Sequence, residues 1–311
     1  MLNNSFQKFL FIILALLTLL PFVNASIALL GGVVFSFLFG NPFLGKTARL
    51  SKILLQLSIV GLGFGLNAVD AFKVSKDGFV ITIATILIVF ALGFLFQKII
   101  KIDKITALLI SAGTAICGGS AIASISPIVK AENEKISIAI GVVFILNAIA
   151  LLIFPPIGQL LDLSQYQFGL WAAIAIHDTS SVVGAAQIFG AEALEVATTV
   201  KLSRALWIIP LTLIVSCFFN KKTKTSGVKI PLFILAFIAA TLIVTVFPQG
   251  KFIFKPISEA AKQLLVTCLF LIGSGISFSQ IKKVGVKSGL FATSLWIIIS
   301  IISLLFIMYR F

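Results

Sequence analysis

Ionisable residues inside apolar stretches are the first candidates for chemistry in this sequence. His177, the only histidine, precedes Asp178 in the middle of one apolar stretch, and Lys201 and Arg204 follow in the next one. Charged groups at membrane depth are expensive, so they usually face a cavity and take part in transport or proton relay. Lys201 and Arg204 are three residues apart, which places them on one face of a helix. These four residues predict a polar site in a membrane-embedded part of the chain.

Each of these residues also has a structural interpretation. The planar guanidinium of Arg204 matches an oxyanion, but it could instead form a buried ion pair with Asp178 or Glu195. Lys201 is nearer the start of its helix and can snorkel toward water. The polar run that follows His177 can also cap the second half of a broken helix, with the cap at Asp178, Thr179 or Ser180. Capping requires the helix to be broken, so it is compatible with a functional site.

A second polar interruption, Cys117-Gly118-Gly119-Ser120, lies within the apolar segment 107–131. Adjacent glycines loosen the backbone, and an unpaired backbone group in lipid is tolerated only where protein or a watery cavity satisfies it. Two half-helices that meet at mid-membrane are how secondary transporters build a substrate site. The alternative is a glycine-kinked helix that packs closely against its neighbours.

The candidate substrate-binding residues come from these two interruptions and the basic pair: Cys117, Gly118, Gly119, Ser120, His177, Asp178, Thr179, Ser180, Lys201 and Arg204. The sequence contains no His-Glu-x-x-His motif and no paired catalytic aspartates, so we expect neither an enzyme nor a cofactor. Its three cysteines all lie in apolar segments, which gives no disulfide framework and no metal-binding spacing.

The composition is that of a polytopic helical membrane protein. Of the 311 residues, 59% are hydrophobic and 11% are charged, and the apolar runs are long enough to cross a bilayer core of about 30 Å. The net charge of +14 comes mostly from bases between apolar runs. Such a juxtamembrane excess indicates topology and contact with membrane lipid rather than nucleic-acid binding.

The hydrophobic pattern predicts an all-α fold with about eleven membrane spans. A single transporter domain covers residues 1–311, with a first helix or signal-like segment at 1–25, a first repeat at 27–155 and a second, permuted repeat at 166–311. The predicted spans are 9–20, 27–39, 53–66, 79–96, 105–129 (broken), 136–154 ending at Pro155-Pro156, 168–189 (broken), 194–219, 230–247, 260–278 and 289–309.

The distribution of Lys and Arg predicts the orientation of the chain. Alternate loops, counted with the N-terminus, hold 14 of these residues, and the opposite set holds 8. By the positive-inside rule the N-terminus is cytoplasmic and the C-terminus is outside. Lys222 and Lys283 belong to the cytoplasmic set in this count.

One internal match predicts inverted structural repeats, because its two copies lie in spans that run in opposite directions, and a second, weaker match accompanies it. Residues 52–74 match residues 262–284 at a constant offset of 210, and both copies contain a Gly-x-Gly. Ala115-Ile-Cys-Gly-Gly-Ser120 matches Ala175-Ile-His-Asp-Thr-Ser180 at an offset of 60. If every span crosses, the two segments of this second match share one direction, so either one span is miscounted or the second match is fortuitous.

Five motifs together resemble the YeiH-type family of bacterial inner-membrane proteins, which are named as sulfate exporters. They are Gly61-Leu-Gly-Phe-Gly-Leu66, Ile116-Cys-Gly-Gly-Ser120, Pro127-Ile-Val-Lys-Ala-Glu132, Ala175-Ile-His-Asp178 with Val182-Val183, and Lys201-Leu-Ser-Arg204. The resemblance extends from about residue 27 to the C-terminus. Asp178 stands where a glutamate is common in the family, which keeps the acid but shortens its reach.

The resemblance implies a multi-pass protein of the bacterial inner (plasma) membrane that transports an anion. More distantly, the Cys-Gly-Gly-Ser break is similar to the crossing helix of bile-acid:sodium symporter-like folds, which implies two crossed, broken helices in a core domain that moves against a panel domain. We therefore expect a secondary transporter that exports a small oxyanion such as sulfate or an organosulfonate, with H⁺ or Na⁺ as coupling ion and a homodimer as one possible assembly. The alternatives are a cation-coupled importer of organic acids and a non-transporting membrane protein of envelope or lysis control.

Overall fold

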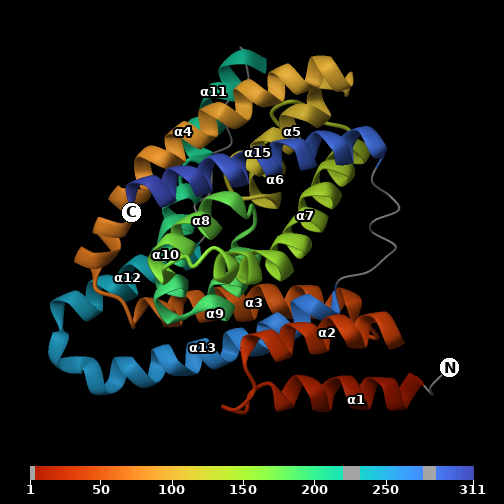
Figure 1. The fold of residues 1–311 in the computed structure, drawn as a ribbon. Helices are drawn as coiled ribbons and strands as arrows, with labels where there is room; N and C mark the ends of the chain where they lie inside the picture. Colours follow the sequence, from red (N-terminus) through yellow and green to blue (C-terminus); the bar gives the residue numbers. More distant parts are fainter. Residues whose placement is uncertain (1–3, 220–231, 276–284) are drawn as a thin grey trace. The chain divides into compact units, whose positions relative to one another are not determined.

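The computed structural model describes residues 4–219, 232–275 and 285–311, and these ranges fold into helices joined by short loops (Figure 1). Five helical segments are long and apolar enough to cross a membrane: Ala68–Ile100, Asn133–Leu160, Ala191–Phe219, Pro248–Ser274 and Val286–Arg310. The all-helical membrane fold expected from the composition is confirmed. Lys222 and Lys283, which the topology count uses, lie outside the described ranges.

The chain forms two compact units, which are described separately. Unit 1 takes in the described parts of residues 1–72 and 231–278, and unit 2 takes in those of residues 73–230 and 279–311. Unit 1 contains the helices α1 (Asn4–Leu17), α2 (Ala25–Phe39), α3 (Leu44–Gly63), α12 (Leu232–Val246) and α13 (Lys251–Ser274), with a 3-10 turn η1 (Pro248–Gly250) before α13. The long helix α4 (Ala68–Ile100) begins in unit 1 and continues into unit 2.

Close helix approach at small residues holds unit 1 together. Gly32 of α2 lies against the backbone of Phe270, and Gly273 of α13 lies against that of Leu29, so α2 and α13 meet with no side chain between them. Such contacts are the usual means of packing helices in lipid, where a hydrophobic driving force is absent. The first segment of the chain forms the helix α1, whose buried Phe11 contacts aromatic rings of α2 and α13.

Gly63 and Gly273, which are equivalent in the offset-210 match, each lie against a neighbouring helix. Gly63 of α3 lies 2.9 Å, measured from a Cβ built on it, from the carbonyl oxygen of Phe237 in α12. Its counterpart Gly273 of α13 contacts α2 instead. Each helix of the matched pair thus packs on the helix that precedes the other member of the pair. The Lys283 end of this match lies outside the described ranges.

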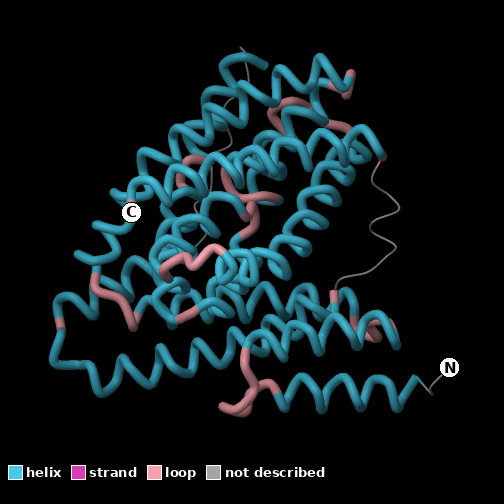
Figure 2. The backbone as a smooth tube through the Cα atoms, viewed as in Figure 1, coloured by secondary structure: helices cyan, strands magenta, loops and turns pink. Residues whose placement is uncertain are grey.

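Unit 2 contains two broken helical segments among longer helices. Besides most of α4, its helices are α5 (Lys104–Ala115), α6 (Gly119–Ile125), α7 (Asn133–Leu160), α8 (Gln165–Ala175), α9 (Thr179–Phe189), α10 (Ala191–Ala205), α11 (Ile208–Phe219) and α15 (Val286–Arg310). Figure 2 draws the breaks as loop segments between helices. The breaks predicted in spans 105–129 and 168–189 are therefore confirmed.

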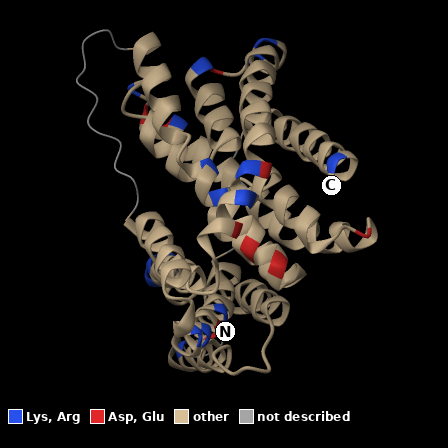
Figure 3. Ribbon diagram, turned by 90° about the vertical axis from the view of Figure 1, so that its left-hand side faces the viewer, with Lys and Arg blue, Asp and Glu red and all other residues tan. Residues whose placement is uncertain are grey.

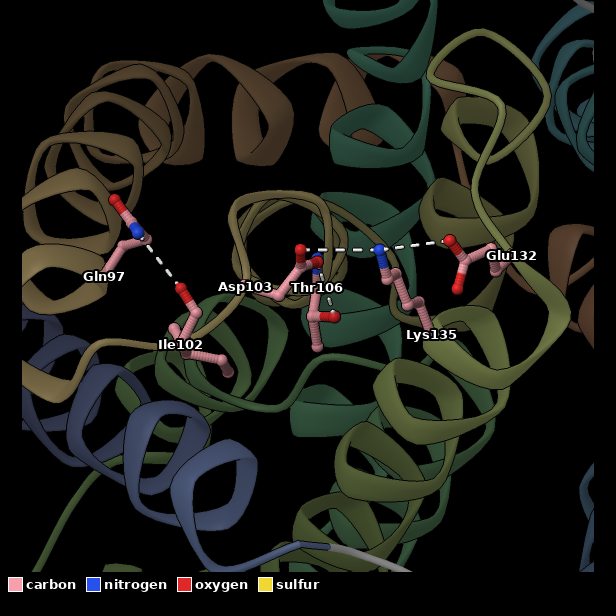
Figure 4. Close-up of polar contacts among 6 residues, drawn as sticks. All are labelled: Gln97, Ile102, Asp103, Thr106, Glu132 and Lys135. Carbon is pink, nitrogen blue, oxygen red and sulfur yellow. Dashed lines mark hydrogen bonds and ion pairs between the residues drawn. The ribbon is translucent and has the colours of Figure 1, made fainter.

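The first broken segment, which we call hairpin 1 (residues 104–132), begins and ends at the same end of unit 2. Lys135, in the first turn of α7, forms an ion pair with Asp103 just before α5, with Nζ and Oδ1 3.4 Å apart (Figure 4). Ile122 of α6 also folds back on Gly113 of α5, where its Cδ1 lies 3.0 Å from a Cβ built on the glycine. The prediction that this segment crosses from one side to the other is therefore wrong.

The base of hairpin 1 is fixed by polar contacts. Asp103 accepts hydrogen bonds from the backbone N–H and the hydroxyl of Thr106, which cap α5, and Lys135 also pairs with Glu132 (Figure 4). Burial by itself raises the pKa of the Asp103 carboxyl, but the bonds from Thr106 and the charge of Lys135 outweigh it. The pKa is lowered overall, so the carboxylate that holds the base stays ionised at neutral pH.

The second broken segment, hairpin 2 (residues 165–190), likewise returns to the end where it starts. Gln165 Oε1 accepts a hydrogen bond of 2.9 Å from the backbone N–H of Glu192, which follows α9. The rings of Phe168 and Phe189 stack with their centroids 3.8 Å apart. The predicted crossing of span 168–189 is therefore also wrong.

The two hairpins enter unit 2 from opposite ends because α7 separates their bases. This helix has 28 residues, about 42 Å at 1.5 Å per residue. Lys135 near its start contacts the base of hairpin 1, and Gly158 near its end lies against Phe168 and Phe189 at the base of hairpin 2. The hairpins therefore point toward each other.

Two predicted spans that contain or end at a proline differ from the structure: one helix continues through its prolines, and the other is interrupted near its proline. The helix α7 continues through Pro155 and Pro156 to Leu160. The ring of Phe154 stacks on that of Trp171 just before the prolines, and helical hydrogen bonding resumes after them, where the N–H of Leu161 donates to the carbonyl of Ile157. The prediction that this span stops at Pro155 is therefore wrong.

Span 194–219 is interrupted rather than continuous. Pro210 has no N–H to offer the carbonyl of Leu206, which accepts from Ile209 at 3.1 Å instead, and a tight turn separates α10 from α11. The helix α10 ends at Ala205, one residue after Arg204, so this side chain lies in the last turn of the helix.

The hairpin geometry predicts which residues face the same side of the membrane. Cysteines introduced at the exposed Lys101 and Lys130 are expected to react with an impermeant maleimide from one side, because both flank hairpin 1. A cysteine at Glu192, near the base of hairpin 2, is expected to react only from the other side. Labelling of intact cells and of inverted vesicles measures this, and opposite accessibility of positions 101 and 130 would show that hairpin 1 crosses.

Candidate functional site

The two helix breaks correspond position by position. The helices before the breaks end at Ala115 and Ala175, and the helices after them begin at Gly119 and Thr179. The offset of 60 that relates the two sequences therefore also relates the two breaks. We call residues 116–118 tip 1 and residues 176–178 tip 2.

The turn at tip 1 depends on Gly118. Its backbone has φ +63° and ψ −125°, a combination that residues with a Cβ rarely adopt. Its N–H donates to the carbonyl of Gly113 at 2.8 Å, which closes α5. A Cβ built on Gly118 would lie 3.6 Å from the Cα of Asp178. The two hairpins therefore meet at their tips.

Tip 2 is held by side chains on both sides of the break. Asp178 caps α9 by accepting hydrogen bonds from the backbone N–H of Ser180, at 3.0 Å, and from the Ser180 hydroxyl. Asn147, from the middle of α7, accepts bonds at Oδ1 from the backbone N–H of His177 at 3.1 Å and of Asp178 at 3.3 Å. The capping role considered for Asp178 is confirmed, and its carboxylate is directed to its own helix.

Lys201 satisfies the C-terminal end of α8. Its ammonium donates to the carbonyl of Ile176 at 2.7 Å and to that of Ala173 at 3.3 Å. The side chain has 0% of its surface exposed. A cation at this place compensates the partial negative charge of the helix end, a contribution that reaches about 2 kcal/mol in partly buried sites.

Arg204 satisfies the C-terminal end of α5 in hairpin 1. Its Nε and one terminal nitrogen, Nη2, both donate to the carbonyl of Ala115, the last residue of α5, at 2.9 and 2.6 Å. Arg204 is also 0% exposed. The two basic residues of one helix, α10, thus each bind the C-terminal end of a different half-helix. Figure 3 shows that basic residues of the chain lie part-way along helices as well as at helix ends.

Buried polar atoms without a partner gather around the tips. Within the described ranges, seven of the nine such side-chain atoms belong to residues of the tips or of the helices that adjoin or contact them: Thr114 Oγ1, Asn147 Nδ2, His177 Nδ1 and Nε2, Gln187 Oε1, Thr198 Oγ1 and Arg204 Nη1. A buried polar group left unpaired costs about 1–3 kcal/mol, so this region suits a polar occupant. Arg204 Nη1 is the charged donor among these atoms.

The solvent exposure of the candidate residues decreases from the surface of unit 2 to this polar region. Ser120 is exposed, and Gly119, Asp178, Thr179 and Ser180 are partly exposed. The deeper members are buried, namely Cys117, Gly118, His177, Lys201 and Arg204. The structure therefore gathers both interruptions and the basic pair in one region, whose open side is lined by the starts of α6 and α9.

Asn147 is the residue of this region that the sequence analysis missed. It is the only polar side chain between Ser137 and Gln159 in an otherwise apolar helix, and this isolation is the signal that could have identified it. The amide binds two backbone N–H groups of tip 2 with its oxygen and leaves Nδ2 unpaired. It thus links a long helix to the break.

Comparison with known proteins shows similarity over nearly the whole chain. The model of a family described as "Conserved hypothetical protein 698" matches residues 9–306. A UPF0324 membrane protein of Vibrio parahaemolyticus is 49% identical over 298 residues, which cover 95% of this chain and 96% of the relative. A UPF0324 membrane protein of Bdellovibrio bacteriovorus is 44% identical, covering 96% and 93%. The resemblance to YeiH-type proteins is thereby confirmed. No solved structure matches the chain.

Gly118 of tip 1 and the adjacent Gly119, the first residue of α6, provide a matched pair of variants. Gly118→Ala is expected to destabilise the protein by roughly 1–3 kcal/mol, because a Cβ strains the backbone at positive φ. Gly119→Ala should be close to neutral, since its Cβ would meet Phe144 at 3.4 Å, an ordinary contact. Thermal unfolding in detergent measures both, and equal melting temperatures for the two variants would contradict the strained turn.

Removing the acceptor that holds tip 2 gives a second prediction. Asn147→Ala should lower stability by about 1–3 kcal/mol, because the buried N–H groups of His177 and Asp178 lose their partner. Asn133→Ala, an exposed position on the same helix, serves as the control and should change the melting temperature little. If both variants melt like the parent, Asn147 does not hold the tip.

Proposed function

The chain belongs to the family described as conserved hypothetical protein 698, whose relatives are membrane proteins, and from this premise we propose that it is a secondary transporter of a small anion. The observation that carries the proposal is the basic pair at the hairpin tips. Lys201 and Arg204 are fully buried, and their hydrogen bonds go to neutral backbone carbonyls. Buried charges normally require compensation, and an anion at the tips would supply it.

Arg204 is the proposed contact to the anion. Its Nε and Nη2 bind Ala115, while Nη1 is buried and has no partner in the described ranges. A guanidinium held at two nitrogens is fixed in direction, so the third can bind an oxygen of a ligand with little loss of entropy. Sulfate and organosulfonates, which remain ionised at physiological pH, are the proposed substrate class, with export as the proposed direction.

The two hairpins support transport by alternating access. Their matching breaks and opposite directions of entry are what an inverted repeat produces. The opposite entry also removes the conflict of direction that arises when every span is counted as crossing. Unit 2 contains both broken segments within one compact body, which supports the inference that it is the substrate-carrying part of the transporter.

The hairpin geometry also supports the proposed orientation in a bacterial inner membrane. When hairpin 1 returns to its side of entry, Lys130 and Lys135 move to the set of loops that already holds 14 basic residues. The count of 14 against 8 then becomes 16 against 6. The positive-inside rule therefore favours a cytoplasmic N-terminus more strongly than the uncorrected count does.

The experiment that tests the proposal replaces Arg204 without removing its charge. In Arg204→Lys the ammonium can still donate to the carbonyl of Ala115, but the unpartnered nitrogen Nη1 is lost. We expect sulfate and methanesulfonate to bind at least about tenfold more weakly, since a hydrogen bond to a charged group is worth about 1.5–3 kcal/mol. Calorimetric titration of the purified protein measures the affinity.

Arg310→Lys, an exposed position near the end of α15, is the control and should bind like the parent. A parent protein that binds none of a panel of sulfate, sulfonates, carboxylates and chloride would overturn the proposed function. Unchanged affinity in a folded Arg204→Lys variant would remove Arg204 from the site.

A further inference from the structure

The carbonyls exposed by a broken helix are where a secondary transporter can hold a coupling sodium ion. Inside an intact helix each carbonyl accepts a backbone N–H, but at a break the last carbonyls are free and carry the negative end of the helix dipole. In membrane transporters such half-helix ends and unwound carbonyls coordinate Na⁺. Unit 2 has two such ends, at Ala115 and at residues 173–176.

Both of these ends are occupied by the protein's own cations. The Lys201 ammonium lies 2.7 Å from the carbonyl oxygen of Ile176 and 3.3 Å from that of Ala173. The Arg204 guanidinium holds the carbonyl of Ala115 with two nitrogens. Each basic group donates its hydrogen bonds at a helix end, and each side chain fills the space in front of the oxygens with no exposed surface.

In both hairpins a basic side chain of α10 binds the carbonyls at the end of the first half-helix. Ala115 and Ala175 are equivalent positions of the two breaks, and one helix, α10, delivers a cation to each break from residues three apart. A sodium ion at either end would have to displace a covalently attached cation or lie beside it. Charge repulsion and the loss of the carbonyl ligands both oppose this.

We propose that Lys201 and Arg204 are tethered replacements for coupling sodium ions, so that anion binding and transport by this protein are independent of sodium. The inference rests on the proposed function for its transport part. Its structural part, that the carbonyls at tip 2 form a cation site filled by Lys201, is independent of any substrate.

Chemical rescue tests the structural part. Lys201→Ala removes the ammonium and vacates the carbonyls of Ala173 and Ile176. The melting temperature of this variant should fall in choline chloride and rise again by roughly 2–4 °C when sodium or methylammonium chloride replaces choline at equal ionic strength. The parent and the control Lys135→Ala, at the hairpin 1 base, should show no difference between sodium and choline.

The sodium dependence of the parent tests the proposal without any variant. Sulfate titrations of the parent with sodium or with choline as the only cation should give equal affinities. A sodium-specific gain in sulfate affinity or in the parent's melting temperature would overturn the proposal. So would a folded Lys201→Ala variant that does not respond to sodium or methylammonium. If the parent binds no anion, the proposed function fails, while the rescue measurement still decides whether Lys201 fills a cation site.

Discussion

Two interrupted helices in the middle of a membrane protein leave backbone groups that must be satisfied without bulk water, and the rest of unit 2 is built around this requirement. At the first break Arg204 binds the last carbonyl of α5. At the second, Lys201 binds the carbonyls and Asn147 the amides, while Asp178 caps the helix that follows. Two helices, α7 and α10, thus converge on the tips because each supplies partners that the backbone lacks.

This solution has an electrostatic consequence. Carbonyl oxygens carry only partial charge, so they do not neutralise the two buried basic groups that bind them. An anion about 4 Å from a unit charge gains about 4 kcal/mol at an effective dielectric constant of 20, before the loss of its hydration. The same residues therefore stabilise the breaks and create the field that would select the substrate. Asp178 sits at the partly exposed margin of this region, where it moderates the positive charge.

The sequence was sufficient to locate the breaks and the basic pair, because polar residues in long apolar runs are conspicuous and have few physical explanations. It did not reveal that the broken segments return to their side of entry, since hydropathy measures how apolar a segment is and not where its ends lie. The decisive contact, between Lys135 and Asp103, joins loops that an alternating count assigns to opposite sides. Arg204 was expected to contact substrate or a carboxylate, and its carbonyl partner was missed because a backbone acceptor leaves no mark in sequence.

The position of Lys201 and Arg204 on one helix links the two hairpins mechanically. Since α10 starts at the base of hairpin 2 and ends just past Arg204, its displacement along its axis would pull on both tips through charged hydrogen bonds. Neither hairpin can move away from α10 without exposing a buried cation and unpaired carbonyls, which is unfavourable in lipid. The tips and α10 should therefore move as one body, and any change in access would have to occur at the surface of unit 2 rather than between its hairpins.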